Sequence, residues 1–100
     1  MQFDTLTLRV QDHIATVRLN RPDKANAMNA AMWQDLRRAF DWIDGEPAAR
    51  VAVLEGEGRH FTAGIDLALM TGIAPQIADP CEGRMREALR RLILDLQDTL

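Results

Sequence analysis

The first twenty residues restrict the possible folds most strongly. Apolar and polar residues alternate over 5–10 and again over 14–20, on either side of a short polar turn at 11–13. A repeat of two residues is that of a β-strand with one buried face, because successive side chains point to opposite sides. Two such runs around a turn predict a β-hairpin. Arg21-Pro22 ends the second strand, since proline donates no backbone hydrogen bond and restricts the residue before it.

A helix is predicted from Asn29 to Gly45. The Asn29 side chain suits the N-cap position, where its oxygen accepts an N–H of the first turn, and Gly45 and Pro47 end the helix. Its charged residues, Asp35 among them, are expected mostly on the solvated face. The predicted apolar face consists of residues at helical spacing: Trp33, Leu36, Phe40 and Ile43, widened by Met32 and Ala39.

Three further segments follow this helix. The continuous apolar run Val51-Ala52-Val53-Leu54 predicts a strand buried on both faces. A short helical turn is predicted over 67–70. The stretch 71–80 contains two prolines and a glycine and therefore predicts a loop.

The last part of the chain, from Arg84 onward, predicts an amphipathic helix. Its arginines lie near Glu87 and Asp95 at helical offsets, which favours a solvated face with ion pairs. No glycine, asparagine or proline stops the helix before Leu100, so we expect residues 1–100 to be the amino-terminal part of a larger domain. The predicted apolar stripe consists of Met85, Leu89, Leu92, Leu96 and Leu100.

Composition narrows the class of protein. Hydrophobic residues make up 47% of the 100 residues and charged residues 27%, as in a soluble globular protein and unlike a disordered one. A net charge of -3 argues against nucleic-acid binding, which needs a basic face. The chain has no apolar run near the roughly 20 residues that span a bilayer and no signal-peptide pattern. Cys81 is the one cysteine, so a reducing compartment, the cytoplasm, is expected.

The residues that could bind a ligand or take part in catalysis lie in two loops, 21–29 and 58–67. Each joins a strand to a helix, and open α/β folds bind ligands at the carboxyl ends of strands. Ala63 and Gly64 leave room for a ligand, and Asp66 suits a helix N-cap. The Ile65 N–H would then point out of a helix amino terminus and could stabilise negative charge, as half of an oxyanion hole. A simple tight turn is the alternative.

Both loops resemble signatures of the crotonase (enoyl-CoA hydratase/isomerase) superfamily, in the same order and spacing. The first signature is Arg-Pro followed by Asn-Ala-hydrophobic, and the second is an aromatic residue, a small residue, Ala-Gly, any residue and Asp-Leu. The second loop is most similar to that of the dienoyl-CoA isomerases. The matching residues are Arg21, Pro22, Asn26, Ala27 and Met28, then Phe61, Thr62, Ala63, Gly64, Asp66 and Leu67.

The resemblance implies an α/β fold, the crotonase-type spiral of β-β-α turns, and a site for acyl-CoA. The first loop would contact adenine and pantetheine through Lys24, Ala25 and Ala27. The Ile65 N–H would donate to the thioester oxygen. The CoA thioester is the substrate, so no cofactor and no metal are implied, and the complete protein would be a homotrimer or hexamer. The residues that would shape the thioester channel are Ala63, Gly64, Asp66 and Leu67.

The implied chemistry is hydration or double-bond isomerisation of an unsaturated acyl-CoA through a thioester enolate. In the family, the proton-transferring carboxylates and the second oxyanion donor come from segments downstream of the matched region. The isolated chain is therefore expected to be inactive, and hydratase or isomerase stays open. A non-catalytic module that binds acyl-CoA or assembles is the other alternative. His60 is expected to be a solvated loop residue.

Overall fold

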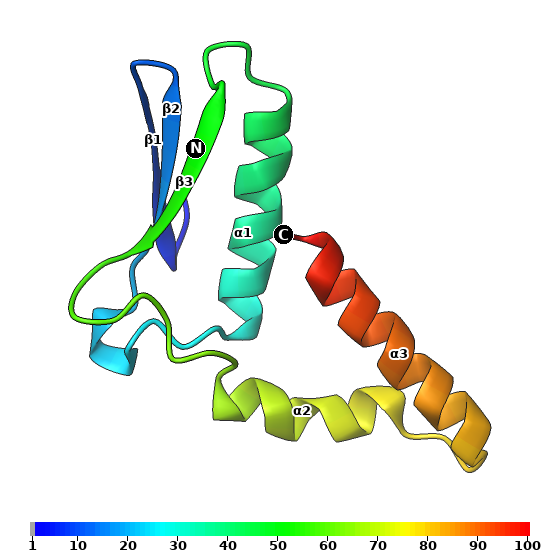
Figure 1. Cartoon of the computed structure of the whole chain (residues 1–100). Helices are drawn as coiled ribbons and strands as arrows, with labels where there is room; N and C mark the ends of the chain where they lie inside the picture. Colours follow the sequence, from blue (N-terminus) through cyan, green and yellow to red (C-terminus); the bar gives the residue numbers. More distant parts are fainter. Residues whose placement is uncertain (1) are drawn as a thin grey trace.

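The computed structural model describes residues 2–100, apart from the side chains of Met70 and Ala74. Its strands form one sheet in the order β1-β2-β3, with α1 alongside it and two further helices leading away (Figure 1). The mixture of strands and helices agrees with the predicted α/β class. The elements are β1 (Leu6–Gln11), β2 (Ile14–Leu19), the 3-10 turn η1 (Pro22–Lys24), α1 (Ala30–Asp44), β3 (Val51–Gly56), α2 (Leu67–Ile77) and α3 (Glu82–Asp98).

The predicted hairpin is confirmed. β1 and β2 pair antiparallel, from Leu6 opposite Leu19 to Gln11 opposite Ile14. The turn between them consists of Asp12 and His13, with φ of 53° and 66°. Positive φ at both central residues matches the right-handed twist of the strands, and aspartate tolerates it.

The core lies between the hairpin and α1. On β2, the buried face alternates as predicted, with Val17 and Leu19 almost fully buried. α1 covers this face with its predicted apolar stripe, because Met32 and Leu36 are completely buried there. Asn29 caps the helix as predicted, and its side chain accepts from the Met32 N–H at 2.8 Å.

Asp35 departs from its prediction. It lies on α1 but is buried, at 6% exposure, instead of on the solvated face. Its Oδ2 accepts from the Thr5 N–H at 3.0 Å, from Thr5 Oγ1 at 2.8 Å and from the Asp4 N–H at 3.1 Å. A carboxylate can be buried when such donors replace water, and here the donors come from the segment that leads into β1.

The prediction that the third strand is buried on both faces is wrong. β3 pairs with β2 in parallel and lies at the edge of the three-stranded sheet. Val51 is 56% exposed and Val53 41% exposed. An apolar run indicates a strand suited to burial, but the elements around it decide how much of it is covered.

The predicted loop at 71–80 is also wrong over most of its length, because α2 continues to Ile77. Pro75 lies inside the helix. A proline within a helix forfeits one backbone hydrogen bond, and α2 ends two residues later. Asp66 caps the helix as predicted, and its side chain accepts from the Ala68 N–H at 2.8 Å. Leu67, Ala68 and Leu69 are good helix formers directly after this cap, which favours a helix start here in spite of Gly72 and Pro75.

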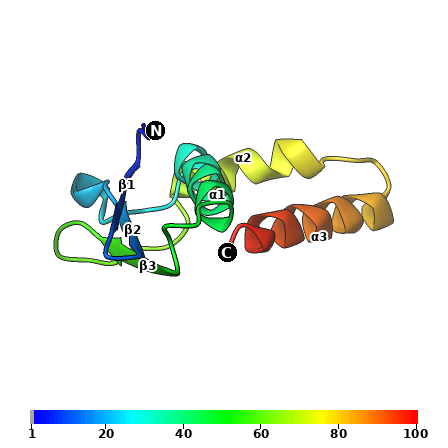
Figure 2. The same ribbon diagram turned by 90° about the horizontal axis from the view of Figure 1, so that it is seen from above.

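The predicted amphipathic helix is confirmed as α3, which ends at Asp98 with Thr99 as its C-cap. Figure 2 shows α2 and α3 on the side of α1 away from the sheet, and Figure 1 shows that they meet at the turn over 78–81 and spread apart toward α1. The predicted ion pairs of Glu87 are present, with Arg90 and Arg91 both at 3.1 Å, and Arg86 pairs with Glu82 at 2.6 Å. Asp95 pairs with Arg37 of α1 at 3.1 Å instead of with an arginine of α3. Arg37 of α1 donates to Thr99 Oγ1 at 3.0 Å and anchors the end of α3.

Candidate active site

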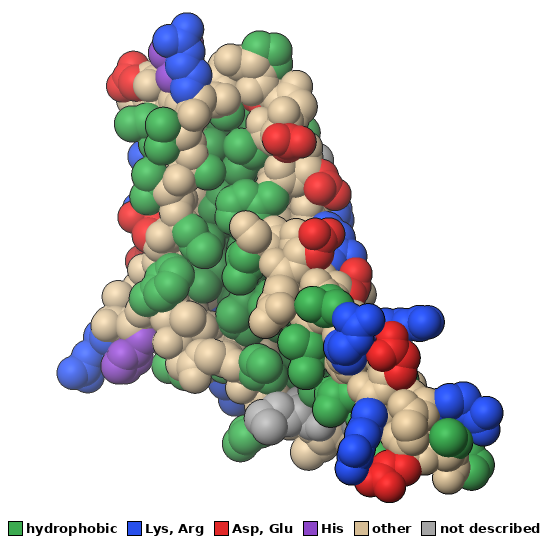
Figure 3. Space-filling view, turned by 45° about the vertical axis from the view of Figure 1, so that its right-hand side comes forward, with side chains coloured by type: hydrophobic (Ala, Val, Ile, Leu, Met, Phe, Trp, Pro, Cys, Tyr) green, Lys and Arg blue, Asp and Glu red, His purple; other side chains and the backbone are tan. Residues whose placement is uncertain are grey.

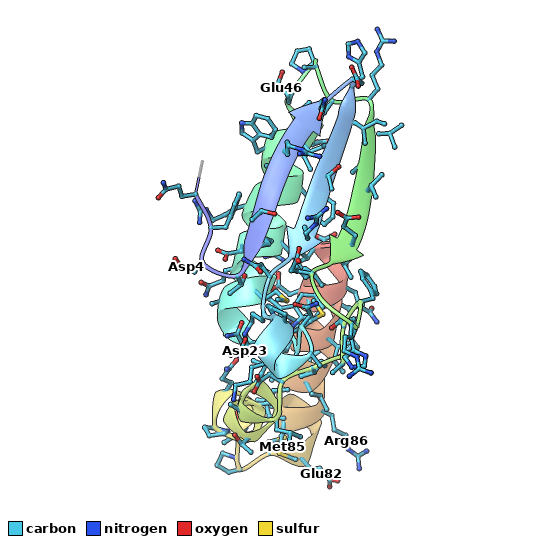
Figure 4. The ribbon with its side chains drawn as sticks, turned by 90° about the vertical axis from the view of Figure 1, so that its left-hand side faces the viewer. Asp4, Asp23, Glu46, Glu82, Met85 and Arg86 are labelled. Carbon is cyan, nitrogen blue, oxygen red and sulfur yellow. The ribbon has the colours of Figure 1, made fainter. Side chains whose placement is uncertain are left out.

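The two loops that carry the candidate site residues start side by side. β2 and β3 run parallel, and their last residues, Leu19 and Gly56, are partners in the sheet. The segments 20–29 and 57–66 therefore leave the same edge of the sheet, as seen below the strands in Figure 1. Asp23 of η1 marks this end of the sheet in Figure 4.

Asn26 fastens the first loop to the second. Its side chain is fully buried. Its Oδ1 accepts from the Arg21 N–H at 2.7 Å, while its Nδ2 donates to the carbonyls of Glu57 and His60, both at 2.8 Å. These bonds hold Asn26 at φ 54°, a left-handed conformation that asparagine tolerates.

Gly56 is required for this contact. A Cβ at Gly56 would lie 2.9 Å from Asn26 Nδ2 and 2.4 Å from the Phe61 carbonyl oxygen. Both distances are shorter than van der Waals contact, so a side chain at Gly56 would push the two loops apart.

Backbone hydrogen bonds continue the junction. The Ala63 N–H donates to the Ala25 carbonyl at 2.9 Å. The Met28 N–H donates to the Gly64 carbonyl at 2.7 Å, and the Asp66 N–H donates to the Met28 carbonyl at 3.0 Å. Met28 and Ile65 thus form an isolated parallel bridge, which aligns the second loop like a short strand against the first.

This bridge leaves one donor unused. Between Ala63 and Asp66, the Ile65 N–H is the backbone donor without an acceptor among residues 2–100. In a parallel bridge the backbone N–H of the central residue points away from its partner strand. Gly64 has φ 92°, and a Cβ built on it meets nothing within 4 Å. The space beside this peptide is therefore open.

An ion pair between Arg21 and Asp66 also joins the two loops. Arg21 Nη1 lies 3.2 Å from Asp66 Oδ2 and also donates to the Ala27 carbonyl. The hydrogen bond from the Ala68 N–H, then that from Arg21, lowers the pKa of Asp66 below its usual value of 3.8, and the charge of Lys24 adds to this. Asp66 is therefore a carboxylate at neutral pH, committed to capping α2 and pairing with Arg21.

The predicted site residues are brought together to different degrees. The backbones of Ala25, Ala63 and Gly64 take part in the junction directly. Lys24 lies exposed at the end of η1, and Leu67 is 78% exposed at the start of α2. Ala27 is half-buried, and its carbonyl accepts from Arg21.

Sequence reasoning missed the side chains that join the loops. Arg21, Asn26 and Thr62 were recognised as motif residues, but no structural role was predicted for them. The available signal was an asparagine and an arginine inside a loop, where a polar side chain often replaces missing backbone partners.

Other polar groups near the site have simpler roles. His60 is exposed, as predicted, and Glu55 and Glu57 pair with Arg18 at 2.6 and 3.2 Å. Within the described part of the chain, no three His, Cys, Asp or Glu residues gather as a metal ion would require. Nor is any helix there long and apolar enough to cross a membrane.

Comparison with known proteins adds independent information. The family model for enoyl-CoA hydratase/isomerase matches residues 9–98. The mitochondrial Delta(3,5)-Delta(2,4)-dienoyl-CoA isomerase of Mus musculus is 40% identical over 89 residues, which are 89% of this chain and 27% of that protein. The chain thus spans about a quarter of the length of this curated relative.

Solved structures agree with the family match. An enoyl-CoA hydratase from Mycobacterium tuberculosis H37Rv superimposes with a TM-score of 0.65 at 37% identity, over 68% of this chain and 27% of that one. An enoyl-CoA hydratase/isomerase (crotonase) from Legionella pneumophila gives a TM-score of 0.73 at 28% identity, over 98% of this chain and 36% of that one. The predicted crotonase-type fold is confirmed for this amino-terminal portion, and the chain belongs to the enoyl-CoA hydratase/isomerase family.

Proposed function

We propose that residues 1–100 supply the CoA-binding loop and one oxyanion donor of an enzyme that hydrates or isomerises an unsaturated acyl-CoA. The first loop, with Lys24, Ala25 and Ala27, takes the adenine and pantetheine parts of the substrate. The second loop, from Ala63 to Leu67, lines the passage of the thioester. Its Ile65 N–H donates to the thioester oxygen.

The observation that carries this proposal is the unused Ile65 N–H. Its neighbours along the chain are bonded, and the bridge to Met28 fixes the peptide that bears it. A backbone donor that is held in place and lacks an internal acceptor suits an oxygen of a ligand. The positive φ of Gly64 and the empty space beside it allow that oxygen to approach.

The chemistry follows from the charge that develops on a thioester. Water addition or a double-bond shift passes through an enolate, with negative charge on the thioester oxygen. A preorganised N–H stabilises that charge more than the neutral ground state, so it lowers the barrier. Carboxylates outside residues 1–100 would move the protons as general acid and base.

Double-bond isomerisation of a dienoyl-CoA is the reaction we favour. Its support is the likeness of the second loop to that of dienoyl-CoA isomerases and the 40% identity with the Mus musculus isomerase. Hydration by an enoyl-CoA hydratase is the second candidate, supported by the structural match at 37% identity. We also propose that the complete protein is a homotrimer or hexamer in the cytoplasm, which cross-linking and fractionation would test.

Proline at Ile65 tests the oxyanion assignment. Ile65→Pro removes the donor without breaking an internal hydrogen bond among the described residues, so kcat should fall by roughly a factor of 100 to 1,000. Ile65→Val is the matched control and should be nearly silent, because the side chain is partly exposed and only the backbone acts. The measurement is turnover of unsaturated acyl-CoA by the complete protein that carries this chain, with melting curves.

Gly64→Val provides a second variant in case proline prevents folding. The valine meets open space, but it must adopt φ 92° or rotate the peptide that bears the Ile65 N–H. We expect a larger loss of turnover than of melting temperature. Wild-type turnover in a folded Ile65→Pro protein would refute the oxyanion role, and tight acyl-CoA binding without turnover in the wild type would support a non-catalytic module instead.

A further inference from the structure

The two loops are also joined by a hydroxyl that the chemistry above does not use. Thr62 Oγ1 donates to the Asn26 carbonyl at 2.7 Å and accepts from the Gly64 N–H at 3.1 Å. One side chain thus connects the CoA-binding loop to the glycine that precedes Ile65. Both contacts are partly buried, so water compensates poorly for their loss.

The two residues that Thr62 connects, Asn26 and Gly64, are held in place in different ways. Asn26 is fully buried, and its side chain is fixed by bonds to three backbone groups. Gly64 has no side chain and no close neighbour at its Cβ position, so its backbone orientation depends on the hydrogen bonds of its own N–H and carbonyl. The Thr62 hydroxyl therefore links a glycine, which has no side chain to hold it, to a fully buried asparagine of the first loop.

The orientation of Gly64 decides where the oxyanion donor points. The peptide between Gly64 and Ile65 is planar, so its carbonyl and its N–H face opposite ways. The carbonyl meets the Met28 N–H at 2.7 Å, which turns the Ile65 N–H outward. Rotation of the Gly64 backbone would misplace both groups, and the bond from the Gly64 N–H to Thr62 opposes that rotation.

We propose that Thr62 is a positioning residue, whose hydroxyl couples the CoA-binding loop to the Ile65 N–H and holds that donor in line with the thioester oxygen. This role rests on the proposed function. It requires a hydroxyl at position 62 and not merely a small side chain. The aromatic-small-Ala-Gly signature asks only for a small residue at this position, not for a hydroxyl.

The kinetic test compares two substitutions in the complete protein. Thr62→Val keeps the shape of the side chain and removes the hydroxyl, so kcat should fall roughly ten- to a hundredfold, with little change in KM, as expected for a misaligned catalytic group. Thr62→Ser keeps the hydroxyl and should restore most of kcat. A folded Thr62→Val protein with wild-type kcat overturns the proposal, and so does a Thr62→Ser protein as impaired as Thr62→Val.

Hydrogen exchange of the Gly64 amide separates this proposal from the proposed function, because it needs no turnover. Exchange should be faster in Thr62→Val than in wild type, and Thr62→Ser should resemble wild type. That result supports the link even if the protein processes no acyl-CoA, in which case the proposed function alone has failed. Equal Gly64 exchange in all three proteins overturns the link.

Discussion

At the scale of single residues, the two loops are held together by polar side chains that each contact more than one group. Asp66 caps α2 through the Ala68 N–H and pairs with Arg21. Arg21 in turn holds the Ala27 carbonyl of the first loop. A substitution of either residue therefore removes a contact between the two loops, although neither residue is assigned a chemical step.

The lowered pKa of Asp66 predicts a dependence of stability on acid. Since its folded-state pKa lies below the usual 3.8, Asp66 stabilises the fold above that pH and the contribution is lost as pH falls through the lower value. Asp66→Asn should therefore flatten the dependence of melting temperature on pH below about pH 4.

Arg21→Gln is a graded companion to this experiment. It removes the second cause of the shift and leaves the larger one, the Ala68 N–H, in place. Its acid dependence should lie between those of wild type and Asp66→Asn. Melting curves of the three proteins from neutral pH into the acid range provide the measurement, and an unchanged acid slope in Asp66→Asn would contradict the assignment.

At the scale of elements, a buried carboxylate joins α1 to the start of β1. Asp35 accepts from Asp4 and Thr5, residues that lie thirty or more positions earlier in the chain. Figure 4 shows Asp4 beside α1, at the end of the sheet where β1 begins. The contact fixes where the hairpin sits along the helix, so it contributes to the register of the core.

Removal of the Asp35 carboxylate should destabilise the fold. Asp35→Ala leaves the Thr5 N–H and hydroxyl buried without a partner, which should lower the free energy of unfolding by about 2–3 kcal/mol. Asp41→Ala on the exposed part of the same helix is the matched control, expected within about 0.5 kcal/mol of wild type. Denaturant unfolding of the complete protein would measure both, and equal effects would show that Asp35 contributes no more than a surface charge.

At the scale of the whole molecule, the apolar surface is incompletely covered. Figure 3 shows hydrophobic side chains continuing over one face of the molecule. A cavity of about 230 Å³ lies where α1, α2 and α3 approach one another, lined by Trp33, Leu69 and Leu92 among others. Met85, Ile93 and Leu94 of α3 are at least one-third exposed. Figure 4 places Met85 far from the sheet.

We therefore expect residues 1–100, produced as an isolated chain, to melt broadly and to self-associate. The exposed edge of β3 offers unpaired backbone groups next to Val51 and Val53, which favours pairing between chains. Val53→Lys should reduce association, because a charge on an edge strand opposes such pairing. Sedimentation and thermal melting would test this, and a sharp cooperative transition of a monomer would contradict it.

Several features followed from the sequence alone because their causes are local. The period of two and the turn determine the hairpin, and the Asn29 cap and apolar spacing determine α1. The paired loop signatures identified the family, which the match to residues 9–98 bears out. Each of these depends on residues within one element or on a fixed motif.

Other features depended on the tertiary structure, because they join residues distant in the chain. Helical periodicity predicted Asp35 on the solvent-exposed face of α1. Its burial is favourable because the Thr5 N–H and hydroxyl donate to it in the folded chain. Apolar composition suggested a fully buried β3, and its position at the sheet edge exposed it. Asn26 and Thr62 bond partners more than thirty residues away in the chain, so the junction that orients the Ile65 N–H exists only in the folded chain.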